Sequence, residues 1–187
     1  IVFVNQPVVV AGRTLRYILV AINVFDRYLY AEALQTKEPT EVKTALGKLL
    51  SLALKKPKLI SSDQGLEFRG LVSAFLVEKG IAQKFKDVGD VNGIGVIDKA
   101  IQSLKQRLAQ LSTGGGTWAS VLARAVAGIN NTPKPGVLHG AAPKEVRDDD
   151  HVRFMLLQDQ AKNLQHNKAL TAKRSAAIHD TGNGHIT

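Results

Sequence analysis

Residues 57–68, Pro57-Lys-Leu-Ile-Ser-Ser-Asp-Gln-Gly-Leu-Glu-Phe, and residues 95–99, Gly95-Val-Ile-Asp-Lys, are the two stretches on which the interpretation of this sequence depends. Residues 58–62 have an apolar centre with turn-forming residues on both sides, which predicts a buried strand. Asp63 then falls at the carboxyl end of that strand, where Gly65 permits a sharp change of direction. This is a common position for a functional side chain.

The second stretch begins a predicted helix. Apolar residues recur in it at spacings of four and three, which is typical of one buried helix face: Ile97, Ile101, Leu104, Leu108 and Leu111. Asp98 borders this apolar stripe near the start of the helix. The two carboxylates, Asp63 and Asp98, are therefore the first candidates for chemistry in this chain.

The rest of the chain supplies the setting for these carboxylates. Three strands are expected at residues 1–10, 15–25 and 28–34, joined by a hairpin turn at 11–14 and a tight connection at 26–27, with Pro7 making its strand irregular. A helix capped by Thr40 (40–54), the strand at 58–62, a helix (67–78) and a strand (81–85) follow. Residues 87–95 are expected to be a loop. Helices are predicted again at 117–130 and 148–178, with a loop at 131–140 and a polar tail at 180–187. This order is expected of the α/β ribonuclease H-like fold, a mixed five-stranded sheet flanked by helices, here with a C-terminal helical extension.

Composition restricts the class of protein. A chain of 187 residues with 44% hydrophobic residues is long enough for one α/β domain and a short extension. The formal charge of +9 attracts polyanions, so DNA or RNA is the first partner to consider, although a basic surface also occurs on proteins that bind neither. The absence of cysteine excludes disulfides and zinc sites built on Cys. No run is suited to membrane insertion, and no internal repeat is evident.

Four blocks of the sequence together resemble the catalytic core of retroviral and retrotransposon integrases, including those of large self-synthesising DNA transposons. The blocks are residues 17–28, 62–68, 95–98 and 130–133, and they agree with that family in order and spacing. The resemblance covers residues 1–147 and leaves residues 148–187 as a charged C-terminal helix and polar tail. It implies an Asp, Asp, Glu triad that holds two Mg²⁺ or Mn²⁺ ions and joins element DNA ends to target DNA.

The chemistry explains why such a triad is acidic. Two divalent cations about 4 Å apart clamp the attacking and leaving oxygens of a phosphoryl transfer, and hard cations prefer carboxylate ligands. On this resemblance Asp63 is the second catalytic and metal-binding residue. Asp98 occupies the third position, where the family usually has Glu; Asp is one methylene shorter but still ligates Mg²⁺ or Mn²⁺.

The first triad position is the anomaly of this sequence. It should lie in the first strand, yet residues 1–25 contain no acidic residue. With a hairpin turn centred near Gly12, Asn5 is expected opposite Val20 and at the position of the first triad member. With a longer hairpin, the family's Asp would instead precede Ile1. The sequence leaves both alternatives open.

Nucleic-acid contacts are implied mainly for the Asp98 helix. The corresponding helix in the family contacts DNA, which makes Lys99, Lys105 and Arg107 candidates, and Gln64 beside Asp63 is a further one. Lys105 lies two turns along the same face as Asp98. For any single lysine, a merely solvated helix face explains the charge equally well.

Two classes of function follow. The chain is either a degenerate integrase core, kept as a nucleic-acid-binding or structural subunit of a larger assembly and needing no metal, or an active metal-dependent polynucleotidyl transferase whose first Asp lies upstream. Another ribonuclease H-fold nuclease is a third candidate, which the blocks at 17–28 and 130–133 disfavour. Self-association is implied by the resemblance. The expected location is inside the cell, in the nucleus or an organelle that contains nucleic acid.

Overall fold

The computed structural model describes residues 1–86 and 91–182. The strands of this α/β chain are β1 (Val2–Val10), β2 (Arg13–Ile22), β3 (Leu29–Leu34), β4 (Leu59–Ser62) and β5 (Ala82–Phe85). Its helices are α1 (Pro39–Ser51), the 3₁₀ turn η1 (Leu66–Phe68), α2 (Leu71–Glu78), α3 (Val91–Ser112), α4 (Trp118–Asn130), α5 (Pro135–Leu138), α6 (Pro143–Asp148) and α7 (Asp150–Gly182).

The five predicted strands form, but as two hydrogen-bonded sheets. β1, β2 and β3 make an antiparallel sheet in that order, and β4 and β5 make a parallel pair beside it. The turn between β1 and β2 is Ala11-Gly12, and both residues have positive φ, 48° and 75°. Two positive φ angles in a two-residue turn match the right-handed twist of a hairpin.

The pairing of β1 with β2 contradicts the predicted position of Asn5. Val8 pairs with Leu15 and Phe3 pairs with Tyr17, so the four residues 4–7 of β1 face only one residue of β2. Asn5 lies inside this irregular stretch and has no register partner, and Val20 pairs with Ala31 of β3. The expectation that Asn5 lies opposite Val20 is therefore wrong. Pro7 lies in the same stretch, which confirms that this strand is irregular there and agrees with its inability to donate a ladder bond.

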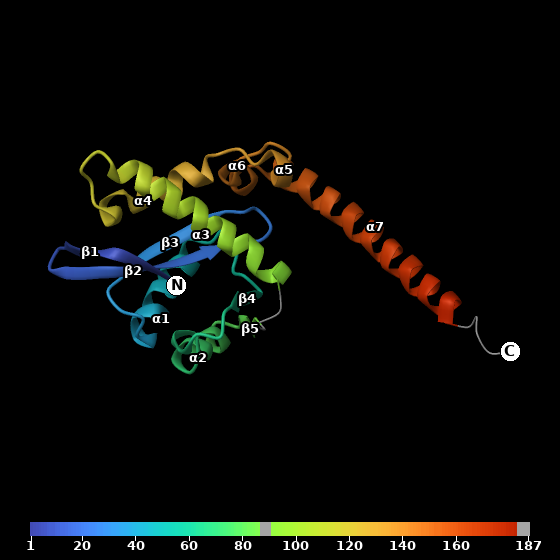
Figure 1. The fold of residues 1–187 in the computed structure, drawn as a ribbon, viewed down its shortest axis with the longest axis horizontal. Coiled ribbons are helices and arrows are strands. Elements are labelled where there is room, and N and C mark those ends of the chain that lie inside the picture. The colour runs from blue at the N-terminus through green and yellow to red at the C-terminus, as the bar shows by residue number, and fades with distance from the viewer. Residues whose placement is uncertain (87–90, 183–187) are drawn as a thin grey trace.

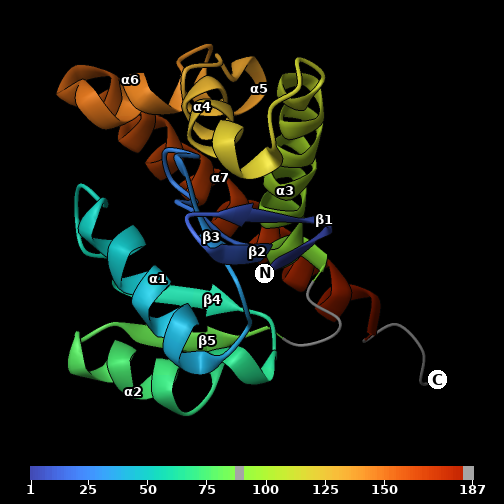
Figure 2. The ribbon, with the colours of Figure 1, turned by 90° about the vertical axis from the view of Figure 1, so that its left-hand side faces the viewer.

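Each face of the three-stranded sheet packs against a separate hydrophobic core (Figure 2). On one face Ile18 and Leu29 pack against α3 and α4, and on the other Leu19 and Leu34 pack against α1 and α2. Adjacent residues such as Ile18 and Leu19 reach different cores because side chains alternate along a strand. The sheet is thus sandwiched between two helical layers.

Helix α3 contributes Leu104 and Leu108 to the first of these cores, with Leu111 partly buried beside them, which confirms the C-terminal part of its predicted apolar stripe. The predicted members Ile97 and Ile101 are half-buried.

Several helix boundaries differ from those predicted. Helix α1 begins at Pro39 with Glu38 as N-cap, so Thr40 is inside the first turn and does not cap it. The predicted 67–78 helix is interrupted, because Gly70 has a φ of +54° and ends η1 before α2 begins. Helix α3 begins at Val91, four residues before the predicted start, and part of the expected 87–95 loop lies outside the described residues. The short helices α5 and α6 were not expected.

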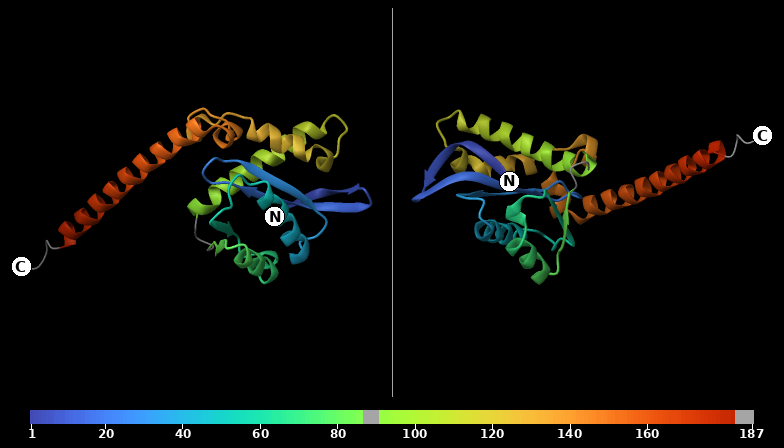
Figure 3. Two further views of the ribbon diagram at one scale, coloured as in Figure 1. Left: turned by 180° about the vertical axis from the view of Figure 1, so that it is seen from behind. Right: turned by 60° about the horizontal axis from the view of Figure 1, so that its bottom comes forward.

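The C-terminal extension is a long helix that runs away from the body (Figures 1 and 3). Its base is attached through Leu156, which packs with Leu138 and Val146, and through His139, whose Nε2 lies 3.3 Å from Asp159 Oδ2. Residues 161–171 are all exposed. Within the described part of the chain, neither α7 nor any other helix is both long and apolar enough to span a bilayer.

Candidate functional site

Asp63 follows β4 directly, as predicted, and its side chain is exposed. The prediction that this strand is buried is wrong, because Leu59 is 51% exposed and the other β4 residues are exposed or half-buried. Asp63 Oδ1 accepts a hydrogen bond from Gly65 N at 3.1 Å, which closes a tight turn at the end of the strand. One carboxylate oxygen is therefore used locally, while the other has no described partner. The position leaves Asp63 open to a ligand but gives it no ion pair within the described residues.

Glycine is favoured at position 65 because a side chain there would collide with its neighbours, and not because the backbone angle is unusual. The φ of Gly65 is −55°, which any residue can adopt, so the backbone angle does not require glycine here. A Cβ at Gly65 would lie 2.6 Å from Glu67 Oε2 and 3.0 Å from Asp63 Oδ1. The carboxylates of Asp63 and Glu67 therefore converge on the position that a side chain at Gly65 would occupy.

Polar contacts join this turn to β5. Gln64 Nε2 donates to the carbonyl of Lys86 at 3.3 Å. Ser73 Oγ donates to Gln83 Oε1 at 2.6 Å, and Gln83 Nε2 donates to the carbonyl of Phe68 at 2.9 Å. Gln64, predicted to contact nucleic acid, is thus placed beside Asp63 but is used in this structure to hold the ends of β4 and β5 together.

Asp98 lies in the second turn of α3 and is exposed. No hydrogen bond or ion pair links it to another described residue. The start of α3 lies on the side of the molecule toward which β4 and β5 run (Figures 1 and 2). Asp63 and Asp98 therefore sit on elements whose ends gather on one side of the fold.

The predicted cationic residues of α3 divide between two faces. Lys99 and Lys105 are exposed, and the seven-residue spacing of Lys105 from Asp98 places both on one face of α3. Arg107 lies on the other side, where its Nε and Nη2 would be 3.2 Å from a Cβ built on Gly128 of α4. Lys105 thus shares the Asp98 face of α3, two turns further along, and Arg107 does not.

The described residues do not fit a two-metal clamp. No group of three or more His, Cys, Asp or Glu side chains among residues 1–86 and 91–182 is arranged to hold a metal ion. Glu67 lies near Asp63, but no described contact joins either of them to Asp98, so these carboxylates do not form one shared site for two divalent cations. We therefore derive no metal-dependent step for this chain.

A buried polar cluster at the turn between β2 and β3 was not found from the sequence. Asp26 is 7% exposed and accepts hydrogen bonds from Asn23 Nδ2 at 3.0 Å and Tyr28 N at 2.8 Å. Burial raises the pKa of Asp26, against the lowering effect of the Tyr28 hydrogen bond and of the charges of Arg147 and Arg153. The cluster ties the turn to α6 and α7.

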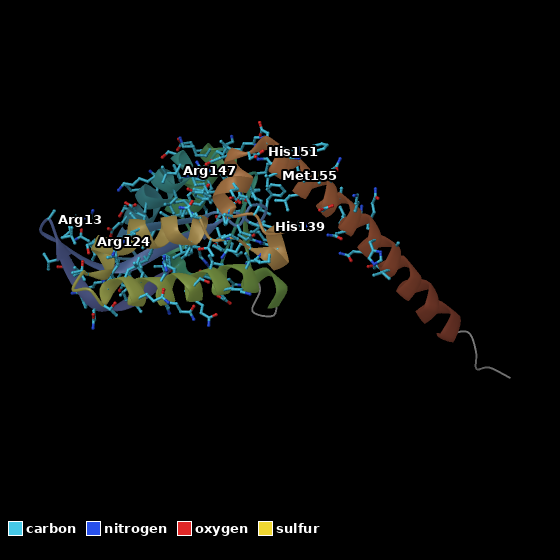
Figure 4. The ribbon with its side chains drawn as sticks, turned by 90° about the horizontal axis from the view of Figure 1, so that it is seen from above. Arg13, Arg124, His139, Arg147, His151 and Met155 are labelled. Atoms are coloured by element: carbon cyan, nitrogen blue, oxygen red, sulfur yellow. The ribbon has the colours of Figure 1, made fainter. Side chains whose placement is uncertain are left out.

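Arg147 is the centre of this attachment (Figure 4). Its guanidinium lies 4.5 Å from the ring centroid of Tyr28 and 5.9 Å from that of Tyr30. Its Nη2 donates to the carbonyl of Leu52, the C-cap of α1, at 2.7 Å. A cation at a helix C-terminus is favoured by the helix dipole. One side chain of α6 thus binds both β3 and α1.

Comparisons with known proteins agree with this architecture. The catalytic core domain of BIV integrase superposes with a TM-score of 0.61 at 22% identity, covering 73% of this chain and 89% of that one. The HTLV-2 integrase catalytic core domain, solved in complex with magnesium in a trimeric form, gives a TM-score of 0.60 at 16% identity, covering 76% and 90%. These likenesses confirm the predicted ribonuclease H-like α/β fold.

Sequence relatives point the same way. The chain is 29% identical over 136 residues to a transposon-derived protein of Caenorhabditis elegans, covering 72% of this chain and 46% of that protein. It is 31% identical over 140 residues to the Gag-Pol polyprotein of koala retrovirus, covering 68% of this chain and 8% of the polyprotein. The chain therefore spans about half of the first relative and a small part of the second. No protein-family model matches it. The fold and these relatives together identify the chain as an integrase-core-like domain, similar to transposon-derived and retroviral proteins.

Proposed function

We propose that this chain is an integrase-core-like domain that binds nucleic acid, is impaired in catalysis, and serves as a structural subunit of a larger assembly. Residues 1–147 would form the core unit and residues 148–187 its charged extension. The assembly would contain further copies of the chain or other nucleoprotein components. The proposed location is the nucleus or an organelle that contains nucleic acid.

The observation that carries the proposal is an integrase-core architecture with an incomplete acidic set. Strand β1 contains no Asp or Glu. We assign Asp63 and Asp98 to the two later positions of the triad. Among the described residues, no group of three or more His, Cys, Asp or Glu side chains is arranged to hold a metal ion. Without such a group, the transition state of phosphoryl transfer loses its main electrostatic stabiliser.

Nucleic-acid binding is supported by charge that is not neutralised within the protein. The formal charge is +9, and neither Lys99 nor Lys105 pairs with a carboxylate among the described residues. Exposed cations of this kind contact phosphates and do not read bases. The expected mode is therefore binding with weak sequence preference.

The binding test measures the affinity for duplex DNA and duplex RNA at two salt concentrations. Affinity should fall steeply with salt, because each phosphate contact releases counterions. Lys105→Gln should weaken binding, and Arg124→Gln, which removes one exposed charge from α4, should have little effect. Salt-independent binding, or none at low salt, would reject nucleic acid as the partner.

The catalytic test is joining of oligonucleotide ends with Mg²⁺ or Mn²⁺. We expect the chain to be inactive or nearly so. The competing proposal is an active transferase, favoured by the exposure of both Asp63 and Asp98 and by the absence of a described ion pair at either. Robust joining by this chain that is abolished by Asp63→Asn would show that it is a working transferase whose first ligand lies elsewhere in the chain than proposed. Asn5→Asp, tested by metal-binding calorimetry, asks whether position 5 corresponds to the first ligand.

A further inference from the structure

A shallow groove between α3 and α4 has a volume of about 190 Å³ and lies away from the Asp98 face. Its cations are Arg107 and Lys134, and the other lining residues are Ser103, Gln106, Gln110, Gly128, Ile129 and Thr132. No carboxylate contributes to it. Arg107 follows Asp98 by nine residues, which is two and a half turns of an α-helix, so the two side chains leave α3 on opposite sides. The groove therefore opens on the side of α3 opposite to Asp98.

Arg107 is exposed, lies against α4 and is not neutralised. Its guanidinium lies against Gly128, where a Cβ would approach within 3.2 Å of Nε and of Nη2. Its one described polar contact is a long hydrogen bond from Nη1 to Gln110 Oε1, at 3.4 Å. Neither Arg107 nor Lys134 has a carboxylate partner among the described residues. A planar guanidinium without an acidic partner can donate two parallel hydrogen bonds to a phosphate.

We propose that this groove is a second phosphate-binding surface for a polynucleotide backbone, separate from the Asp98 face. Arg107 binds a phosphate through its guanidinium, Lys134 adds a second charge, and the Gln106 and Gln110 amides donate to phosphate or sugar oxygens. The inference rests on the proposed nucleic-acid binding. It adds that the backbone contacts both sides of α3.

The first test removes the two charges together. The Arg107→Gln, Lys134→Gln double variant should reduce the slope of log affinity against log salt by about 2, because two phosphate contacts are lost. Arg124→Gln, an exposed cation of α4 outside the groove, should leave the slope unchanged. Both DNA and RNA duplexes are measured, since a loss on both indicates the shared phosphate chemistry and a loss on one identifies that polymer as the ligand.

Helix stability is the competing explanation, because Arg107 and Lys134 lie near the negative end of α4. On that explanation the double variant unfolds at lower urea concentration, while its salt slope is that of the parent. A less stable double variant with the parent's salt slope would reject phosphate binding by the groove. If the parent chain binds duplex in the same assay, the proposed function would still stand. Failure of the parent to bind either duplex would reject both proposals.

A second test uses the absence of cysteine from the chain. Gln106→Cys places one unique thiol in the groove, and Ala123→Cys places one on the exposed side of α4. Bound duplex should slow maleimide modification at position 106 at least tenfold more than at position 123. Equal rates with and without duplex at position 106, under conditions where the variant binds, would overturn the proposal.

Discussion

The side chain of Asn130 forms two hydrogen bonds with the backbone of Leu29. Leu29 N donates to Asn130 Oδ1 at 2.8 Å, and Asn130 Nδ2 donates to the carbonyl of Leu29 at 2.9 Å. Both residues are almost completely buried. The amide at the end of α4 therefore satisfies a donor and an acceptor at the first residue of β3, and it fixes α4 on the sheet. This gives the Asn130 block, noticed for its resemblance to integrases, a structural role.

Replacing Asn130 by Ala should lower the free energy of unfolding by roughly 2–4 kcal/mol, because it leaves two buried backbone groups without partners. Asn130→Asp keeps an acceptor but loses the donor, so it should also destabilise at neutral pH. Asn131→Ala, at the exposed neighbouring position, should change stability by no more than about 0.5 kcal/mol. Urea denaturation measures all three. Equal stability of the Asn130 and Asn131 variants would contradict the role of the amide.

Arg147 should be irreplaceable by lysine. Arg147→Ala should cost roughly 1–3 kcal/mol, since it removes the stacking on Tyr28 and the hydrogen bond to the Leu52 carbonyl. Arg147→Lys should recover only part of this, because an ammonium lacks the planar group that stacks. Hydrogen exchange of α6 amides should rise in both variants and remain unchanged in Arg124→Ala. If the Arg147→Lys variant were as stable as the parent, the positive charge alone would account for the stabilisation by Arg147.

Glu41 should make the stability of the fold sensitive to acid. Burial opposes its ionisation, but hydrogen bonds from Gln35 N and from Thr36, together with the charge of Arg13, lower its pKa. A lowered folded-state pKa means that the unfolded chain binds the proton more tightly. The stabilisation from Glu41 is therefore present above the unfolded pKa of about 4.5 and is lost as the pH falls through the folded value.

The corresponding test is Glu41→Gln, with Glu38→Gln as an exposed control. At pH 7, Glu41→Gln should reduce the free energy of unfolding by about 1–2 kcal/mol, because charge-assisted hydrogen bonds are lost. The difference from the parent should narrow as the pH falls below 4.5. Unfolding curves collected between pH 3 and pH 7 measure this. A constant difference across that range would contradict the assignment.

Gly65 and Glu67 should be energetically coupled. Gly65→Ala should cost about 1 kcal/mol, because its methyl group displaces the Glu67 carboxylate and crowds Asp63. Glu67→Ala alone should cost less, and it should relieve most of the cost of Gly65→Ala when the two are combined. A double-mutant cycle of unfolding free energies measures the coupling. Strict additivity would show that the convergence over Gly65 has no energetic consequence.

Local patterns in the sequence were sufficient for most elements. The apolar stripe of α3, the strand before Asp63 and the hairpin at Gly12 depend on neighbours within a few residues, so their periodicity and turn chemistry are visible in the chain. The helix predicted at 117–130 also forms, and its start depends on a local contact, because the Thr117 side chain accepts a hydrogen bond from Ser120 N. The resemblance to integrase cores also followed from local blocks, and the structural comparisons confirmed it.

Only the tertiary structure decided the relationships between distant segments. The irregular pairing of residues 4–7 removed Asn5 from its expected register, because pairing depends on how two strands pack and not on the position of the turn alone. The spacing of Arg107 from Asp98 places the two on opposite sides of α3, but only the packing of α4 brings Gly128 against the Arg107 guanidinium. The hydrogen bonds between Asn130 and Leu29 join residues that are far apart in the sequence, and so does the stacking of Arg147 on Tyr28. Their spacing along the chain does not predict either contact. These contacts arise because buried polar groups must find partners wherever the fold brings them together.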